Sequence, residues 1–304
     1  MIAAAAVPPS DPEPRHWISC ADDFAIDEGA VDGILELIER GRITATSALV
    51  DSPLWQSSAQ QLRAQLQRSA AHGSSRADVG LHLNLTQAFA GQKTAVWPLA
   101  ELMARCALRA VPRPLLHRAI EHQLDAFEEA LGQRPDYVDG HQHVHQFAVV
   151  REALVGALRR RYGSRLPWVR STRPPAAVRD LKARGIAALG DRRLRELAAA
   201  SQLATNAYLV GVYDFRADAR AYWMHLERWV REGPEATVLM SHPALRSRAE
   251  DPLAAARPME FAALASAQFG VLLERAHIAL TTGTQLLGRA QVGPAERAGA
   301  LANG

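Results

Sequence analysis

Strand-like and helix-like segments alternate along nearly the whole chain, and this alternation restricts the fold more than any other feature. Apolar or β-branched runs predict about seven strands, and the segments between them have the spacing of amphipathic helices. Eight segments are candidates for these strands: residues 16–21, 44–50, 78–86, 139–145, 167–171, 208–212, 236–240 and 278–282. We expect the helices within residues 27–40, 57–71, 99–108, 114–131, 149–162, 176–203 (broken at Gly185 and Gly190), 220–232 and 260–275.

Alternation of this kind predicts a mostly parallel sheet with helices outside it. No Gly-rich phosphate-binding turn follows the first strand, which argues against an open, dinucleotide-binding sheet. We therefore expect an α/β fold consisting of a single (β/α) barrel of TIM-like type, regular or distorted. The chain of 304 residues, 48% of them hydrophobic, is long enough for one such domain.

We place that domain at residues 15–287. Residues 1–14 lack the basic and apolar regions of a signal peptide and are expected to form a disordered leader. Small residues dominate from 288 onward, so 288–304 are expected to form a flexible tail.

Charge and cysteine content exclude several classes of protein. The net charge is only +3, and the basic residues are scattered, so nucleic-acid binding is not expected. No apolar run reaches the roughly 18 residues of a membrane span. Two cysteines, Cys20 and Cys106, exclude a disulfide scaffold and fit a reducing compartment. We expect a soluble, cytoplasmic protein.

One motif, Asp139–Gly140–His141–Gln142–His143–Val144–His145, is the strongest chemical signal. If this segment is extended, the three histidines and Asp139 point to the same face. Imidazoles and carboxylates are ligands of divalent transition metals. A lone histidine is more often structural, but this cluster predicts a metal or catalytic site.

Other polar residues follow predicted strands. Asp22 and Asp23 come after the first strand, where α/β folds place their chemistry, although an isolated carboxylate pair serves equally well as a turn or cap. The polar face of the third strand either lines the barrel near its mouth or faces solvent. His242 follows a strongly buried strand. The full set of candidates is Asp22, Asp23, His82, Asn84, Asp139, His141, His143, His145, Arg170 and His242.

If these strand ends meet at one rim, they fit metal-assisted hydrolysis. One aspartate and two histidines would bind the cation and leave positions open for water and substrate. A second carboxylate would take a proton from the water, and a histidine across the site would protonate the leaving group.

At these residues the sequence resembles the YdjC-like carbohydrate deacetylases, which include the chitooligosaccharide deacetylases and hopanoid-associated relatives. Five segments carry the resemblance, which spans about residues 17–285. They are Ala21–Asp22–Asp23–Phe24, residues 42–47, Gly80 to Thr86, Asp139 to His145, and His242–Pro243–Ala244.

The resemblance implies a distorted (β/α) barrel, one divalent cation (Mg²⁺ or Zn²⁺) and removal of acetyl from an N-acetylated sugar or glycolipid headgroup. By position it implies that Asp23, His82 and His141 bind the metal, that Asp22 is the general base and that His242 is the proton donor. Asp139 would then orient a ligand histidine, and Arg170 would orient a catalytic carboxylate or contact substrate. The remaining candidates, His143, His145 and Asn84, would support the site or face the substrate, and the family makes a homodimer plausible.

The chain departs from the family pattern at two positions. Cys20 stands where the family usually has Asn, and Ala25 stands where it has Gly. The second change requires a turn that a residue with a Cβ can adopt.

Two alternatives stay open at this point. One is another metal-dependent hydrolase on a similar barrel, such as an amidohydrolase or a phosphoesterase, which often holds two metals. The other is a carbohydrate-binding relative without turnover. Substrate choice is expected to depend on residues 88–113 and 172–207.

Overall fold

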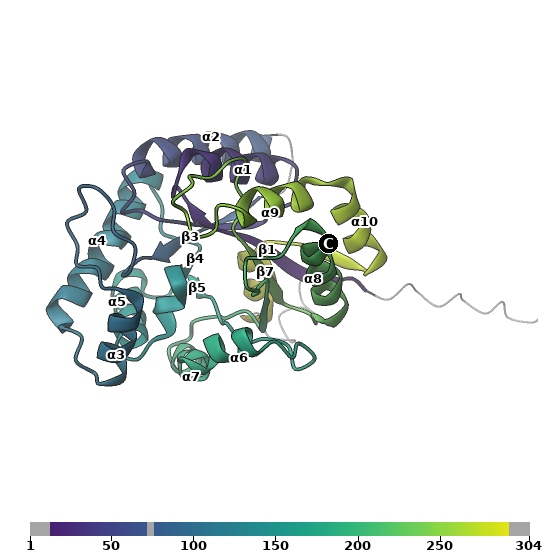
Figure 1. Ribbon diagram of the computed structural model, residues 1–304. Coiled ribbons are helices and arrows are strands. Elements are labelled where there is room, and N and C mark those ends of the chain that lie inside the picture. Colours follow the sequence, from purple (N-terminus) through teal and green to yellow (C-terminus); the bar gives the residue numbers. More distant parts are fainter. Residues whose placement is uncertain (1–12, 72–75, 292–304) are drawn as a thin grey trace, which may run out of the picture.

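A curled sheet of eight parallel strands lies at the centre of the computed structural model, which describes residues 13–71 and 76–291 (Figure 1). The strands are β1 (Arg15–Phe24), β2 (Ala45–Ala48), β3 (Asp78–Leu83), β4 (Tyr137–Gly140), β5 (Trp168–Val169), β6 (Tyr208–Val210), β7 (Thr237–Ser241) and β8 (Ile278–Leu280). Seven follow the order β5-β4-β3-β2-β1-β7-β6, and β8 pairs with the start of β1. A single bridge between Val169 and Thr205 links the β5 edge to the segment before β6. The fold is the predicted distorted, barrel-like α/β fold.

Helices surround this sheet and follow the predicted pattern closely. They are α1 (Glu28–Glu39), α2 (Trp55–Ala71), α3 (Leu99–Ala107), α4 (Arg113–Leu131), α5 (Val150–Tyr162), α6 (Leu181–Ala188), α7 (Asp191–Ala200), α8 (Ala219–Glu232), α9 (Ala256–Ala265), α10 (Ala267–Arg275) and α11 (Gly283–Gln291). Asp27 caps α1, because its side chain accepts a hydrogen bond from the Ala30 N–H at 2.7 Å.

Two details of the helix prediction were wrong. The segment expected as one helix over 260–275 is two helices, because Ser266 is extended, ends α9 and caps α10 through the Phe269 N–H. Gly185 lies inside α6 and does not break it. Gly190, with φ 154°, does separate α6 from α7.

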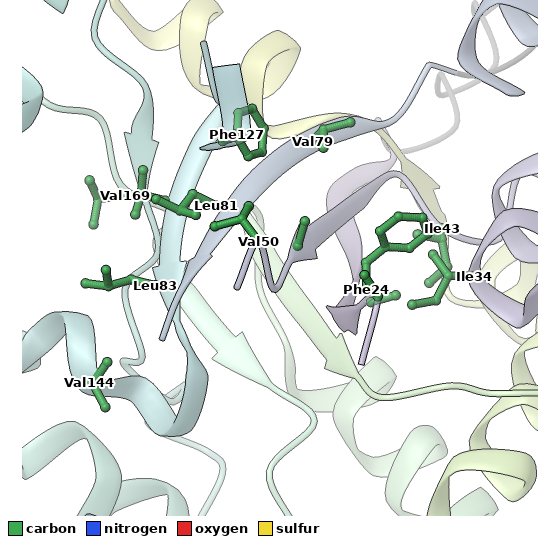
Figure 2. Close-up of a cluster of buried hydrophobic side chains, with 14 of the residues drawn as sticks. Phe24, Ile34, Ile43, Val50, Val79, Leu81, Leu83, Phe127, Val144 and Val169 are labelled. Atoms are coloured by element: carbon green, nitrogen blue, oxygen red, sulfur yellow. The ribbon is translucent and has the colours of Figure 1, made fainter. Parts of the chain in front are cut away.

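Successive strand residues divide the interior into two apolar clusters, as the alternation of side chains in a strand requires. Trp17 and Ala21 of β1 pack with helix residues in the larger cluster. Figure 2 shows part of this cluster, including Phe24 and Val79. Ile18 and Cys20 of the same strand pack in the smaller cluster, where the Tyr137 and Trp168 rings stack at 4.3 Å. Cys20 of this smaller cluster contacts Asp22 and the Arg170 guanidinium, so the cluster adjoins polar residues at the strand ends.

The predicted leader falls mainly on residues 1–12, and the predicted tail mainly on 292–304, both outside the described residues. Helix α11 continues past the expected boundary at 287 to Gln291. Within residues 13–71 and 76–291, no helix has both the length and the apolar character needed to cross a membrane.

Candidate metal centre and active site

An irregularity at the end of β1 brings Asp22 and Asp23 to the same cavity. The register between β1 and β2 shifts between Ala21 and Phe24, and Asp23 has a left-handed backbone with φ 64°. Neighbouring strand residues normally point to opposite faces, but the bulge lets both carboxylates line the cavity. Ala25, where the family has glycine, also adopts a left-handed φ of 73°, so the turn does form with a Cβ present.

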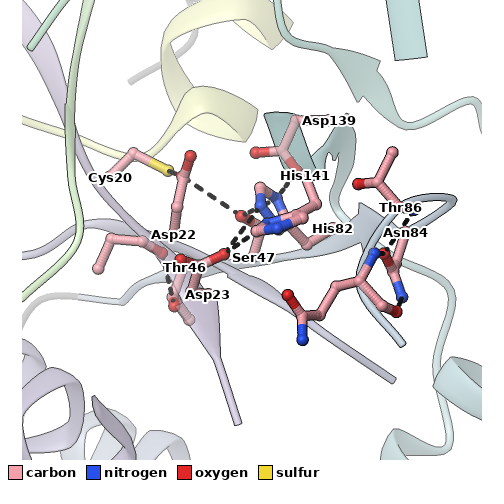
Figure 3. A network of polar contacts seen from close by, with 12 residues as sticks. Cys20, Asp22, Asp23, Thr46, Ser47, His82, Asn84, Thr86, Asp139 and His141 are labelled. Atoms are coloured by element: carbon pink, nitrogen blue, oxygen red, sulfur yellow. Dashed lines mark hydrogen bonds and ion pairs between the residues drawn. The ribbon is translucent and has the colours of Figure 1, made fainter. Parts of the chain in front are cut away.

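Strand pairing places His82 of β3 directly beside Asp139 of β4. Nδ1 of His82 lies 2.6 Å from Oδ1 of Asp139 and 3.0 Å from the Ser47 hydroxyl (Figure 3). The other ring nitrogen, Nε2, lies 3.3 Å from Oδ1 of Asp23. His82 is 2% exposed, so the expected polar face of this strand is its buried side and does not face solvent.

The histidine motif is not an extended strand, and the prediction that three histidines share one strand face was wrong. β4 ends at Gly140, and a 3-10 segment, η1 (His141–Gln146), follows with left-handed backbone at Gln142 and His143. A Cβ at Gly140 would lie 2.8 Å from the His145 backbone nitrogen, so the chain can return this closely only at a glycine.

This turn gives the three histidines different environments. Nδ1 of His141 lies 3.0 Å from Oδ1 of Asp23, and the ring of His141 meets the His82 ring edge to face at 5.5 Å. His143 lines the same cavity. His145 lies behind it, with Nε2 2.8 Å from the backbone oxygen of Arg170.

Asp23, His82 and His141 form the metal-type centre. Each offers a ligand atom, and these atoms lie within 4.8 Å of one another. One carboxylate and two imidazoles fit a divalent cation with open positions, and Asp139 would orient the His82 ring from behind.

Electrostatics keeps the carboxylate of this centre charged. Although burial opposes ionisation, the Arg257 guanidinium and His141 hold the pKa of Asp23 well below its usual range. Burial also opposes protonation of His82, but the Asp139 carboxylate outweighs it and raises the pKa of His82 to about 10. A cation at Nε2 of His82 therefore competes with a proton for that nitrogen.

Arg257 was not predicted from the sequence. It projects from α9, is 1% exposed, and its Nη2 lies 2.8 Å from Oδ2 of Asp23, while Nε bonds Asp251. Arg257 thus occupies one oxygen of Asp23 and leaves Oδ1 facing the two histidines. An arginine in a helix with no motif around it gives no signal in the sequence that would separate it from a surface residue.

Arg170, expected to orient a catalytic carboxylate or to contact substrate, holds the neighbouring carboxylate of Asp22. Its guanidinium donates to both oxygens of Asp22, at 2.6 and 2.7 Å, and lies 2.8 Å from Oδ2 of Asp139. Burial alone would raise the pKa of Asp22, but the pairing with Arg170 outweighs burial and holds this pKa far below its usual value.

A second group of ligand types, Cys20, Asp22 and Asp139, also clusters at this position. The Arg170 guanidinium lies against all three residues and already supplies the positive charge there. Burial, together with Asp22, raises the pKa of the Cys20 thiol well above its usual value, so it stays protonated. The cluster is therefore an ion-pair network and not a second metal site.

His242 follows β7 and reaches the cavity from the side of α9. Its backbone N–H donates to Oε2 of Glu260 at 2.5 Å, and Oε1 of Glu260 accepts from the Tyr213 hydroxyl at 2.6 Å. Burial lowers the pKa of His242 to about 4, against the opposing effect of Asp23 and Asp22, so the ring is neutral at pH 7. Its Nδ1 has no hydrogen-bond partner among the described residues. Glu260 and Tyr213 were not predicted, since neither belongs to a recognisable motif.

The cavity in which these groups meet has a volume of about 420 Å³. Six of the predicted residues line it: Asp22, Asp23, His82, His141, His143 and His242. Asp139, His145 and Arg170 lie behind this lining. Asn84 is also outside it, where its side chain accepts from the Thr86 and Gln87 backbone N–H groups and so shapes the turn that carries Gln87 into the cavity.

These features define a class: distorted (β/α)-barrel proteins with an Asp–His–His centre at the C-terminal ends of the strands. Within that class the chain belongs to the YdjC-like protein family, whose model matches residues 17–275.

Two curated relatives and one solved structure illustrate the similarity. A carbohydrate deacetylase from Mus musculus is 33% identical over 168 residues, covering 51% of this chain and 49% of that protein. A chitooligosaccharide deacetylase from Serratia marcescens is 26% identical over 230 residues, covering 74% of this chain and 79% of that protein. The match thus spans about half the length of the mammalian relative. A solved structure from Enterococcus faecalis V583, provisionally described as a cellobiose-phosphate cleavage protein, aligns with a TM-score of 0.66 at 20% identity, covering 90% of this chain and 100% of that one.

Proposed function

We propose that the protein is a divalent-cation-dependent hydrolase that removes the acetyl group from an N-acetylated amino sugar and releases acetate. The observation that carries the proposal is the convergence of Asp23, His82 and His141 in a cavity that Asp22 and His242 also line. The names of the relatives, carbohydrate deacetylase and chitooligosaccharide deacetylase, support the choice of an acetylated sugar.

In this proposal Asp23, His82 and His141 hold one cation, either Mg²⁺ or Zn²⁺. When bound, it would polarise the acetamide carbonyl and make a water molecule more acidic. Arg257 keeps Asp23 in its binding orientation, and Asp139 does the same for His82. The protein thus holds the ligand side chains in position in advance, so that they need to move little when the cation binds.

Two residues would handle the protons. Hydrolysis breaks the amide C–N bond, the oxygen of water becomes part of acetate, and one proton must reach the departing nitrogen. Asp22 is ionised at all working pH values and accepts the proton of the attacking water. His242 is neutral at pH 7, so it must first receive a proton. The proton that Asp22 takes from the attacking water would pass to His242, and His242 would deliver it to the departing nitrogen. Neither residue gains a proton over a full turnover.

The experiment is a measurement of acetate release from N-acetylglucosamine and its β-1,4 oligomers with Zn²⁺ or Mg²⁺ added. We expect release by the natural protein, a loss of at least about 10²-fold in His141→Ala, and unchanged release in His117→Ala, which alters an exposed histidine on α4. The absence of acetate release from every N-acetylated sugar in such a panel, with either cation, would overturn the proposal.

Location and assembly are also proposals. Cys20 and Cys106 are both free and buried, which supports a reducing, cytoplasmic environment. The homodimer expected from the family resemblance is tested by a mass measurement in solution.

A further inference from the structure

Two carboxamide groups, those of Gln87 and Gln142, line the same cavity as the metal-type centre. Gln87 lies in the turn after β3, the strand of His82, and Gln142 directly follows His141 in the turn after β4. β3 and β4 are neighbours in the sheet. Both glutamines therefore come from the side of the cavity that also supplies the two ligand histidines.

These two carboxamides are largely free to bind a ligand. Gln142 is exposed, and its side chain makes no hydrogen bond within the part of the chain that the structure describes. Gln87 is half-buried, and its Nε2 donates to the backbone oxygen of Ala88 at 3.3 Å. A carboxamide has two N–H donors and an oxygen with two lone pairs, so each side chain keeps most of its hydrogen-bonding capacity.

Other polar groups of the cavity walls are less available. The ammonium group of Lys182 donates to the Tyr213 backbone oxygen at 2.5 Å, and the Asp251 carboxylate is paired with Arg257. Nδ1 of His143 is buried. Among the described wall residues outside the proposed cation and proton-transfer groups, the two glutamines therefore offer the most accessible donors and acceptors.

The backbone at both glutamines is held in place by the surrounding fold. Asn84 is 1% exposed; its side chain accepts from the Gln87 N–H at 2.8 Å and donates to the Gln87 backbone oxygen at 2.7 Å. Gln142 has a left-handed backbone with φ 53° and ψ 27°, which is unfavourable for a residue with a Cβ. Unfavourable backbone of this kind is concentrated at binding and active sites. A side chain on a fixed backbone also loses less conformational freedom when it binds a ligand.

Ring hydroxyl groups are the chemistry that two neutral carboxamides recognise best. A hydroxyl donates one hydrogen bond and accepts others, and a carboxamide can do both at once. A charged substituent would find no opposite charge on these two side chains. An apolar substituent would take water from them without replacing its hydrogen bonds, which is unfavourable.

We propose that Gln87 and Gln142 are specificity-determining residues that bind ring hydroxyl groups of the sugar whose acetamide reaches the metal-type centre. This inference rests on the proposed deacetylase function and assigns the choice of a hydroxylated ring to two named side chains. Both lie outside residues 88–113 and 172–207, where substrate choice was expected from the sequence. An acetamide on a ring without these hydroxyl groups is then a poorer substrate.

The test measures kcat/KM for methyl N-acetyl-β-glucosaminide and for its 3-deoxy, 4-deoxy and 6-deoxy analogues, with saturating cation. The natural protein should hydrolyse at least one analogue about three- to tenfold less efficiently, because a net hydrogen bond between neutral groups contributes about that much. In Gln142→Met and Gln87→Met the preference for the hydroxyl that each residue binds should disappear, mainly through a higher KM. Methionine keeps the Cβ and the length of glutamine but makes no comparable hydrogen bond.

Gln202→Met is the matched control. Gln202 is also exposed and has a left-handed backbone with φ 61°, but it lies outside this cavity. The substitution should leave kcat/KM for all four substrates unchanged.

The outcomes separate this inference from the proposed function. Equal kcat/KM for all four substrates, or a preference that neither cavity variant changes, would overturn the inference and leave the deacetylase function standing. A uniform loss for all four substrates, with weaker cation binding by titration calorimetry, would also overturn it, since the glutamines would then only support the ligand histidines. No acetate from these or any other N-acetylated sugars, with either cation, would overturn the function itself.

Discussion

Asp22 and Asp23 are neighbours in the sequence, yet each is held by its own buried arginine. Arg170 binds both oxygens of Asp22, whereas Arg257 binds a single oxygen of Asp23 and leaves the other toward His82 and His141. The two carboxylates therefore differ in what they can do: Asp23 keeps one oxygen directed at the two histidines, whereas both oxygens of Asp22 accept from an arginine. The sequence predicts the pair and Arg170 as a partner, but it does not indicate Arg257, because an ion pair between residues 234 positions apart has no local pattern.

The first prediction concerns Asp22. Asp22→Asn should lower kcat about 10²–10⁴-fold, because an amide cannot accept the proton of the attacking water. Cation binding, measured by titration calorimetry, should remain, since Asp22 is not among the three ligands. Asp32→Asn, at a half-buried position on α1 outside the cavity lining, is the control. A variant that retains full turnover would show that Asp22 is not the proton acceptor.

The second prediction concerns Arg257. Lysine keeps the charge but has no planar fork, so it cannot hold Asp23 and Asp251 together. Arg257→Lys should therefore weaken cation binding about 10–100-fold in the same calorimetric titration. Arg246→Lys, which changes an exposed arginine paired with Glu28 and Asp32, should not change it. Equal dissociation constants for the natural protein and Arg257→Lys would exclude a positioning role.

At the scale of elements, periodic apolar spacing predicts the helices well. The segment predicted worst is the histidine motif, which supplies residues of the candidate site. Alternation in the motif 139–145 suggests a strand, but left-handed backbone at Gln142 and His143 forms η1 in its place. Contacts across the fold stabilise that turn: His145 meets the Arg170 backbone, and Gly140 permits the close return. Such long-range contacts override a local pattern and cannot be derived from it.

Glu260 links α9 to the end of β7 and should make stability depend on pH. Burial raises the pKa of Glu260 from 4.5 to about 7, although it accepts hydrogen bonds from His242 and Tyr213. The folded protein thus keeps a proton that the unfolded chain has lost, so the unfolding free energy contributed by this group falls as pH rises from about 4.5 to about 7. The loss is on the order of 3 kcal/mol.

Denaturant unfolding at pH 5 and pH 8 measures this effect. The natural protein should lose more stability between these values than Glu260→Gln, which cannot ionise, by on the order of 3 kcal/mol. Glu274→Gln, at an exposed position on α10, should behave as the natural protein does. The same pH dependence in the natural protein and Glu260→Gln would mean that Glu260 is already ionised at pH 5.

At the scale of the whole molecule, alternating elements predict a parallel barrel-like sheet and therefore one rim for the strand ends. At this rim the structure brings together Asp23, His82 and His141, which come from β1, β3 and the turn after β4. The position of β8 beside the start of β1 depends on how distant segments pack. The same is true of the set of apolar residues that line the cavity. Neither feature has a signature in the local sequence.

The central claim is that these three residues together hold one cation on which acetate release depends. The most direct measurement is acetate release by chelator-treated, dialysed protein during titration with Zn²⁺ or Mg²⁺, with bound metal determined by elemental analysis. The account predicts that activity is lost on metal removal and returns in proportion to bound metal, reaching its maximum at about one ion per chain. Full acetate release from protein proved free of metal would contradict it.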